Sequence, residues 1–116
     1  MSATRPDPQT HLPLRPVVFE ILLILNEGER HGYGLMQDLE RRSNGRWVLG
    51  PGTLYRTLSE MTEKAFIEPG GKRKAADAGD ERRRYHRLST YGRKVAAAEA
   101  RRMEGLVQVA QSGKLL

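Results

Sequence analysis

The sequence predicts a mainly α-helical domain with a small β-hairpin. Apolar residues recur at helical spacing in four segments, at about 16–27, 31–42, 51–64 and 89–111. Two short alternating runs, 65–68 and 84–88, flank a basic, glycine-containing segment, as expected of a hairpin. The length of 116 residues leaves room for one modest core, so we expect a single domain.

The first helix is expected to be well buried. Pro16 suits the first position of a helix, where its missing N–H costs nothing, and Gly28 suits the residue just beyond the end. The residues between them are apolar almost all round, which predicts burial in the domain and leaves open a contact with a partner subunit. Residues 1–13 hold three prolines and no periodic pattern, so they are expected to be a flexible leader.

The second helix begins in His31-Gly32-Tyr33-Gly34 and ends at about Arg42, before the turn-forming residues 43–45. Residues 46–49 form either a short strand or the lead into the next helix. The lone Trp47 fits a packing residue better than a platform for a ligand.

The third helix, from Pro51 to about Lys64, is the segment that the rest of the domain is expected to hold. Leu54, Leu58 and Met61 recur at i, i+4 and i+7 and form a buried stripe. The polar residues expected on the opposite face are Thr53, Arg56, Thr57, Glu60 and Lys64. Short hydroxyls and an arginine are typical of a helix that reads the major groove of DNA, although many surface helices also have a polar outer face.

The last helix is expected to leave the domain. Ser89 is a good N-cap, and roughly 20 residues make a helix of about 30 Å, longer than the rest of this small domain can cover. Its apolar stripe consists of Val95, Ala96, Ala100, Met103, Leu106, Val107 and Ala110. We expect this stripe to pack on the same helix of a second subunit; the alternative is that it folds back on its own core.

Composition narrows the classes of function. The chain has 20 basic and 14 acidic residues, and its net charge of +6 favours a polyanionic partner such as DNA. It lacks cysteine, and its three histidines are far apart in sequence, so neither a metal nor another cofactor is expected. No paired carboxylates or nucleophile–base motif predicts an enzyme. Without an apolar run of about 18 residues or a signal-peptide core, no membrane is expected as a partner and a cytoplasmic location is the default.

The predicted order is helix, helix, helix, strand, basic loop, strand, long helix, which is a winged helix-turn-helix domain (14–88) followed by a C-terminal dimerisation helix (89–112). The chain resembles the PadR family of bacterial transcriptional regulators. The matching segments stand in the family's order at Glu27 to Glu40, Leu49 to Met61, Phe66 to Glu68 and Arg82 to Arg93. A single C-terminal helix is similar to the shorter branch of the family, whose members are homodimeric repressors.

The resemblance implies where DNA would lie. Tyr33 stands at the start of the second helix, where backbone N–H groups and the helix dipole favour a phosphate. Pro51, Gly52, Thr53 and Tyr55 match the motif of the family's DNA-reading helix. Tyr55 is equally compatible with a packing role beside Leu54.

Two basic groups complete the expected surface. Arg56 is expected to contact either a guanine or a phosphate. Lys72, Arg73 and Lys74 fall on the wing, the loop of the hairpin, whose second half is acidic, so contacts are expected only in its first half. The chain departs from the family's usual pattern at Gly50, His86 and Ser89; at Gly50 this removes a side-chain cap.

The expected function is therefore a sequence-specific DNA-binding repressor, a homodimer on a pseudo-palindromic operator in double-stranded DNA. The sequence leaves open whether a small-molecule effector relieves repression. The alternative is a winged-helix interaction module that binds protein, or nucleic acid without sequence preference.

Overall fold

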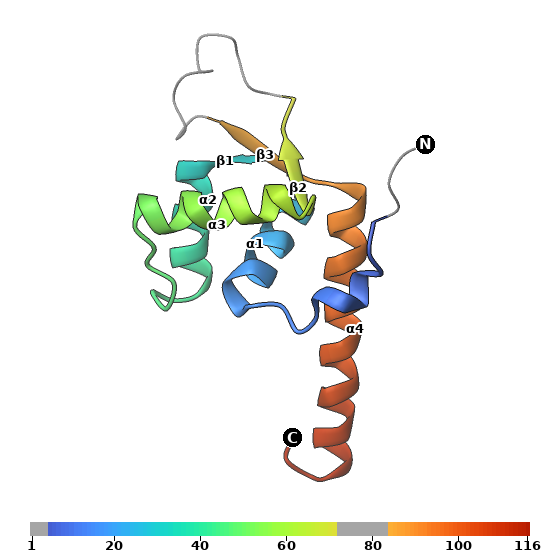
Figure 1. Cartoon of the computed structure of the whole chain (residues 1–116). Helices are drawn as coiled ribbons and strands as arrows, with labels where there is room; N and C mark the ends of the chain where they lie inside the picture. Colours follow the sequence, from blue (N-terminus) through green and yellow to red (C-terminus); the bar gives the residue numbers. More distant parts are fainter. Residues whose placement is uncertain (1–4, 72–83) are drawn as a thin grey trace.

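The computed structural model describes residues 5–71 and 84–116 of the chain (Figure 1). The helices are a short 3₁₀ helix η1 (Pro8–His11), α1 (Pro16–Asn26), α2 (Gly32–Arg42), α3 (Pro51–Glu63) and α4 (Thr90–Ser112). The strands are β1 (Arg30–His31), β2 (Ile67–Pro69) and β3 (Tyr85–Leu88). The mainly α-helical fold with a winged helix-turn-helix order and a long C-terminal helix is thus confirmed.

Among the described residues, the sheet has one strand more than the predicted hairpin. Its order is β1-β3-β2 and both pairings are antiparallel, with Ile67 opposite Leu88 and Arg30 opposite His86. β1 is only two residues long, so it is too short to produce the alternating pattern by which strands are recognised in a sequence.

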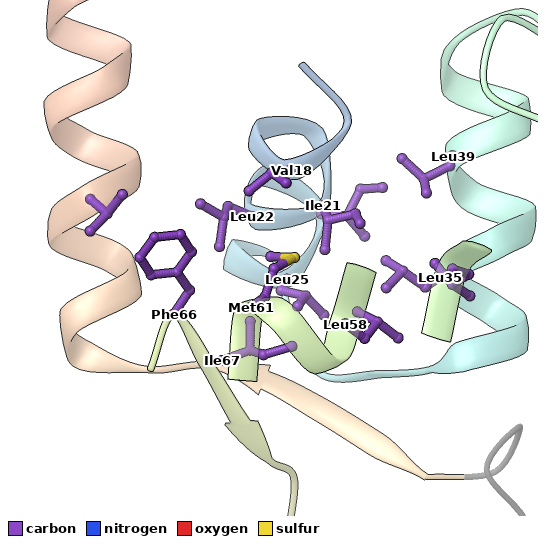
Figure 2. Close-up of a cluster of buried hydrophobic side chains, with 13 residues drawn as sticks. Val18, Ile21, Leu22, Leu25, Leu35, Leu39, Leu58, Met61, Phe66 and Ile67 are labelled. Atoms are coloured by element: carbon purple, nitrogen blue, oxygen red, sulfur yellow. The ribbon is translucent and has the colours of Figure 1, made fainter. Parts of the chain in front are cut away.

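The core is built around α1, as its composition predicts. Ile21 and Leu22 are fully buried, and Leu35, Leu58 and Phe66 converge on them from other elements (Figure 2). α1 contacts α2, β3 and α4, so helices and sheet together enclose it. Each large apolar side chain removed from water in this way contributes about 1.5–3 kcal/mol.

The start of α4 is joined tightly to the sheet. The hydroxyl of Ser89 accepts the backbone N–H of Gly92 at 2.8 Å, which confirms Ser89 as the N-cap. The backbone N–H of Ser89 donates to the carbonyl of Phe66 at 3.1 Å. A Cβ atom at position 92 would overlap that same carbonyl oxygen, so only glycine allows α4 to approach the chain here.

The N-terminal segment differs from the expected leader, because residues 8–11 form η1 and pack against α4. His11 Nε2 lies 2.8 Å from the hydroxyl of Tyr91, and that hydroxyl donates to the carbonyl of Pro6 at 2.7 Å. A single turn held by individual side chains leaves no periodic pattern in the sequence, which is why the prediction missed it.

Two further expectations are corrected or resolved. Thr57 was expected on the outer face of α3, but it is buried, and its hydroxyl donates to the carbonyl of Thr53 at 2.9 Å. The buried face of α3 is therefore wider than the leucine stripe indicates.

Residues 46–49 form no strand and lead into α3; the indole of Trp47 packs on the core and its N–H donates to Glu20.

Within residues 5–71 and 84–116, no helix is both long and apolar enough to span a bilayer.

The two glycines of α4 test the junction between α4 and the sheet. Gly92→Ala is expected to destabilise the fold by about 1–3 kcal/mol or more, because the new methyl group has no space. Gly105→Ala is the matched control, since nothing lies near a Cβ there and alanine favours a helix interior by about 0.5–1 kcal/mol. Thermal unfolding of both variants measures the difference; equal melting temperatures would contradict the close approach.

Candidate DNA-binding surface

α2 and α3 approach each other closely where Gly32 faces Tyr55. A Cβ atom at Gly32 would lie 2.7 Å from Cε1 and 2.8 Å from the hydroxyl oxygen of Tyr55, so the first turn of α2 rests directly on this ring. The hydroxyl oxygen of Tyr55 is buried. Of the two roles that the sequence left open for Tyr55, packing is therefore the one that the structure supports.

The start of α2 presents Tyr33 to solvent. His31 caps the helix, because its Nδ1 accepts the backbone N–H of Gly34 at 2.9 Å. Tyr33 is 49% exposed, so its hydroxyl is free to reach a ligand outside the domain. This is the placement that a phosphate contact requires.

The outer face of α3 is also open. Pro51, Gly52, Thr53 and Arg56 are all exposed, over a buried stripe that includes Leu54. Gly50 supplies no side-chain cap, so the N–H groups of the first turn can bind a phosphate.

Ion pairs separate the arginines of this surface into two groups. Arg41 pairs with Asp38 at 2.6 Å and Arg42 pairs with Glu27 at 2.6 Å, and these pairs neutralise the end of α2. The hydrogen bond from Arg42 also lowers the pKa of Glu27. By contrast, Arg56 has no ion-pair partner within the described residues, so its guanidinium remains available to DNA.

Arg46 was missed by the sequence analysis. It lies in the turn between α2 and α3, is exposed, and like Arg56 has no ion pair in the part of the chain that the structure describes. A basic residue in the turn of a helix-turn-helix pair was the signal available in the sequence.

The proposed wing contacts Lys72, Arg73 and Lys74 lie outside the described residues. The base of the hairpin is described: Arg87 pairs with Glu68 at 2.8 Å across β3 and β2, and Glu29 accepts the N–H of Gly71 at 3.3 Å. These two carboxylates were not singled out from the sequence, because the pairing becomes visible only when the strand register is known.

The stripe predicted for dimerisation divides into two parts along α4. Val95 is fully buried in the chain's own core and Ala96 packs against that core, so the assignment of Val95 to a subunit interface is wrong. The remaining stripe residues are Ala100, Met103, Leu106, Val107 and Ala110. They lie on the part of α4 that projects beyond the rest of the domain (Figure 1), where Leu106 is 57% and Val107 is 44% exposed.

Within the described residues, no three His, Asp or Glu side chains are grouped so that they could hold a metal ion. A winged-helix fold with an open polar face on α3 is an arrangement typical of DNA-binding regulators.

Comparison with known proteins gives the family. The model of the PadR-like family of transcriptional regulators matches residues 21–98, more than half of the chain. The chain therefore belongs to the PadR-like family, whose members are transcriptional regulators, a class that is generally not enzymatic.

Two individual relatives are similar over part of the chain. The transcriptional regulator YqjI of Escherichia coli (strain K12) is 34% identical over 70 residues, which cover 57% of this chain and 32% of that protein. The chain thus spans about a third of the length of that relative. The uncharacterized protein X of Lysinibacillus sphaericus is 29% identical over 80 residues, 63% of this chain and 64% of its own length.

Solved structures share the fold. A PadR-like transcriptional regulator from Bacillus cereus superposes with a TM-score of 0.64 at 21% identity, covering 85% of this chain and 90% of that one. A transcriptional regulator from Clostridium thermocellum gives a TM-score of 0.64 at 23% identity, covering 83% and 87%.

The different exposure of two tyrosines leads to opposite expectations. Tyr33→Phe removes an exposed hydroxyl and is expected to weaken DNA binding by about 0.5–1.5 kcal/mol without changing the melting temperature. Tyr55→Phe removes a buried hydroxyl and is expected to leave DNA affinity unchanged. Filter binding and thermal melts on the same samples separate the two effects; a selective loss of DNA affinity in Tyr55→Phe would restore it as a contact residue.

Proposed function

We propose that this protein is a sequence-specific DNA-binding repressor that acts as a homodimer on a pseudo-palindromic operator. The observation that supports this function best is the combination of two surfaces on one small domain. One is the open polar face of α3, and the other is the exposed apolar side of the projecting half of α4.

The first surface suits the major groove. α3 would enter the groove with Thr53 and Arg56 towards the bases, since arginine binds guanine or a phosphate in the bidentate way. Tyr33 and the first-turn N–H groups of α3 would contact the flanking phosphates, which set the register on the duplex. Lys72, Arg73 and Lys74 would add a phosphate or minor-groove contact from the wing, and the net charge of +6 favours the encounter.

The second surface suits a two-fold dimer. Leu106, Val107 and Met103 would pack against the same residues of a second copy, with the small Ala100 and Ala110 allowing the helices to approach closely. Two α3 helices would then meet successive major grooves, about 34 Å apart, on a site with the same two-fold symmetry.

Repression follows if the operator overlaps the start of transcription, because a bound dimer excludes the polymerase. A small-molecule effector at the paired α4 helices would relieve repression only if it bound the DNA-competent and the incompetent arrangement unequally. A regulator of chromosomal DNA acts in the cytoplasm, where we therefore place it.

Arg56→Ala tests sequence-specific reading. It is expected to lose about 1–3 kcal/mol on a selected site and to relax the preference between sites, if the guanidinium reads a base. Arg101→Ala is the matched control, since it removes the same charge from an exposed position on the projecting half of α4. Competition between the selected site and random duplex at several salt concentrations is the measurement. A wild type without preference for the selected site would favour the interaction-module alternative.

Leu106→Glu tests the dimer. The side chain is largely exposed in one subunit, so the charge is expected to leave the fold intact and to separate the subunits at micromolar concentration. Gln108→Glu adds the same charge at an exposed polar position on the same helix and is expected to remain dimeric. Sedimentation of both variants gives the answer, and a monomeric wild type would exclude the two-fold arrangement.

A further inference from the structure

The N-terminal strap, which we define as residues 5–15, ties α4 to the rest of the domain. At its start, the hydroxyl of Tyr91 joins the carbonyl of Pro6 and the ring of His11. At its end, the backbone N–H of Leu14 donates to Oε2 of Glu99 at 2.9 Å. The strap and Glu99 both lie outside residues 21–98, the part of the chain that matches the family model.

Glu99 is the centre of this arrangement. Its side chain is fully buried, and a buried carboxylate is costly unless it is paired and hydrogen-bonded. The guanidinium of Arg102 donates to both carboxylate oxygens, through Nε to Oε1 and through Nη2 to Oε2 at 3.2 Å. These hydrogen bonds lower the pKa of Glu99, so the carboxylate remains ionised and continues to accept the hydrogen bond from the Leu14 N–H.

The hydrogen bond between Leu14 and Glu99 is important because of where Glu99 lies along α4. Along α4, all of which is described, Glu99 is the last residue with a buried side chain. The helix continues to Ser112, about 20 Å further at 1.5 Å per residue, without covering from the domain (Figure 1). If α4 tilted by about 10° at Glu99, the C-terminal end of the helix would move by about 3 Å.

The other side of the strap reaches towards α3. The ring of His11 packs edge-on against Phe66, with centroids 4.9 Å apart, and Leu14 packs against the core. Arg15 pairs with Glu60 of α3 at 3.0 Å. The strap thus lies between α4 and the second half of α3, in contact with both.

We propose that the strap, held by the hydrogen bond from Leu14 to Glu99, fixes the direction of α4 relative to α3. This direction in turn sets the separation of the two DNA-reading helices in the dimer. Glu99 is a positioning residue, because it acts on DNA only through the angle of α4. The inference rests on the proposed homodimer, in which the projecting halves of α4 form the interface.

The test measures how strongly the protein prefers one spacing of half-sites. The probes are a palindromic site selected by the wild type from random duplex, the same site with two base pairs inserted at its centre, and a single half-site. The insertion increases the distance between the half-sites by about 7 Å, so the wild type is expected to bind the altered site much more weakly.

Glu99→Ala removes the acceptor of the Leu14 N–H. It leaves Arg102, whose side chain is 35% exposed, free to turn to water. Losing hydrogen bonds to a charged group shifts the docking equilibrium of the strap by about ten- to a hundredfold. We therefore expect the ratio of affinities for the selected and the altered site to fall about tenfold or more, with half-site affinity and dimerisation unchanged. Glu99→Gln, which keeps an acceptor for the Leu14 N–H, is expected to lose less. The control Glu104→Ala, at an exposed position on the same helix, is expected to keep the wild-type ratio.

Tyr91→Phe provides a second variant that acts from the other end of the strap. It keeps the ring and deletes only the hydroxyl that joins His11 and Pro6, so a smaller fall in the same ratio is expected with the fold intact. If the Glu99 and Tyr91 variants keep the wild-type ratio of affinities for the selected and altered sites, the positioning role is wrong but the homodimer is not. The same conclusion follows if they lose half-site and full-site affinity equally. A wild type that binds the full site no better than the half-site overturns both proposals.

Discussion

The burial of α1 is the constraint on which the rest of this structure depends. Its residues are apolar almost all round, so the helix is stable only when other elements enclose it on most sides. α2, β3 and α4 contact it directly, and α3 completes the core through side chains such as Leu58 and Met61 (Figure 2). Because α1 occupies the centre, α3 is left at the surface with its polar face outward. The exposed polar face of α3 is thus a consequence of how the core is packed.

The contact between Gly32 and Tyr55 transmits that constraint to the surface. The two residues are more than twenty positions apart in the chain, yet a Cβ atom at position 32 would overlap the ring of Tyr55 unless that ring shifted. Tyr33, next to Gly32, is turned to solvent by the same geometry. Neighbouring residues in one motif therefore have different tasks, one in packing and one at the surface.

α4 combines two environments in one continuous helix. Its first part is anchored by Ser89, Gly92, Val95 and Glu99. These anchors differ in kind: a cap, a close backbone approach, apolar burial and a hydrogen bond from Leu14 to a buried carboxylate. Its second part is exposed and apolar, which suits association with another chain. A polar anchor at the boundary specifies direction more strictly than apolar packing does, because hydrogen bonds depend on orientation whereas apolar burial does not.

The sequence by itself determined the four long helices, the two strands of the hairpin, the Ser89 cap and the family, because periodicity, caps and turn residues are local signals. It also placed Tyr33, Thr53 and Arg56 at the surface, where the structure has them. Only the tertiary structure decided the roles of Thr57 and Val95, which are buried, and of Tyr55, whose hydroxyl oxygen is buried. The same holds for the N-terminal strap and Glu99. A helical pattern shows which side is apolar but not how wide a neighbouring element makes the buried face. Likewise, a one-turn segment held by single hydrogen bonds to residues some 80 positions away has no periodicity to reveal it.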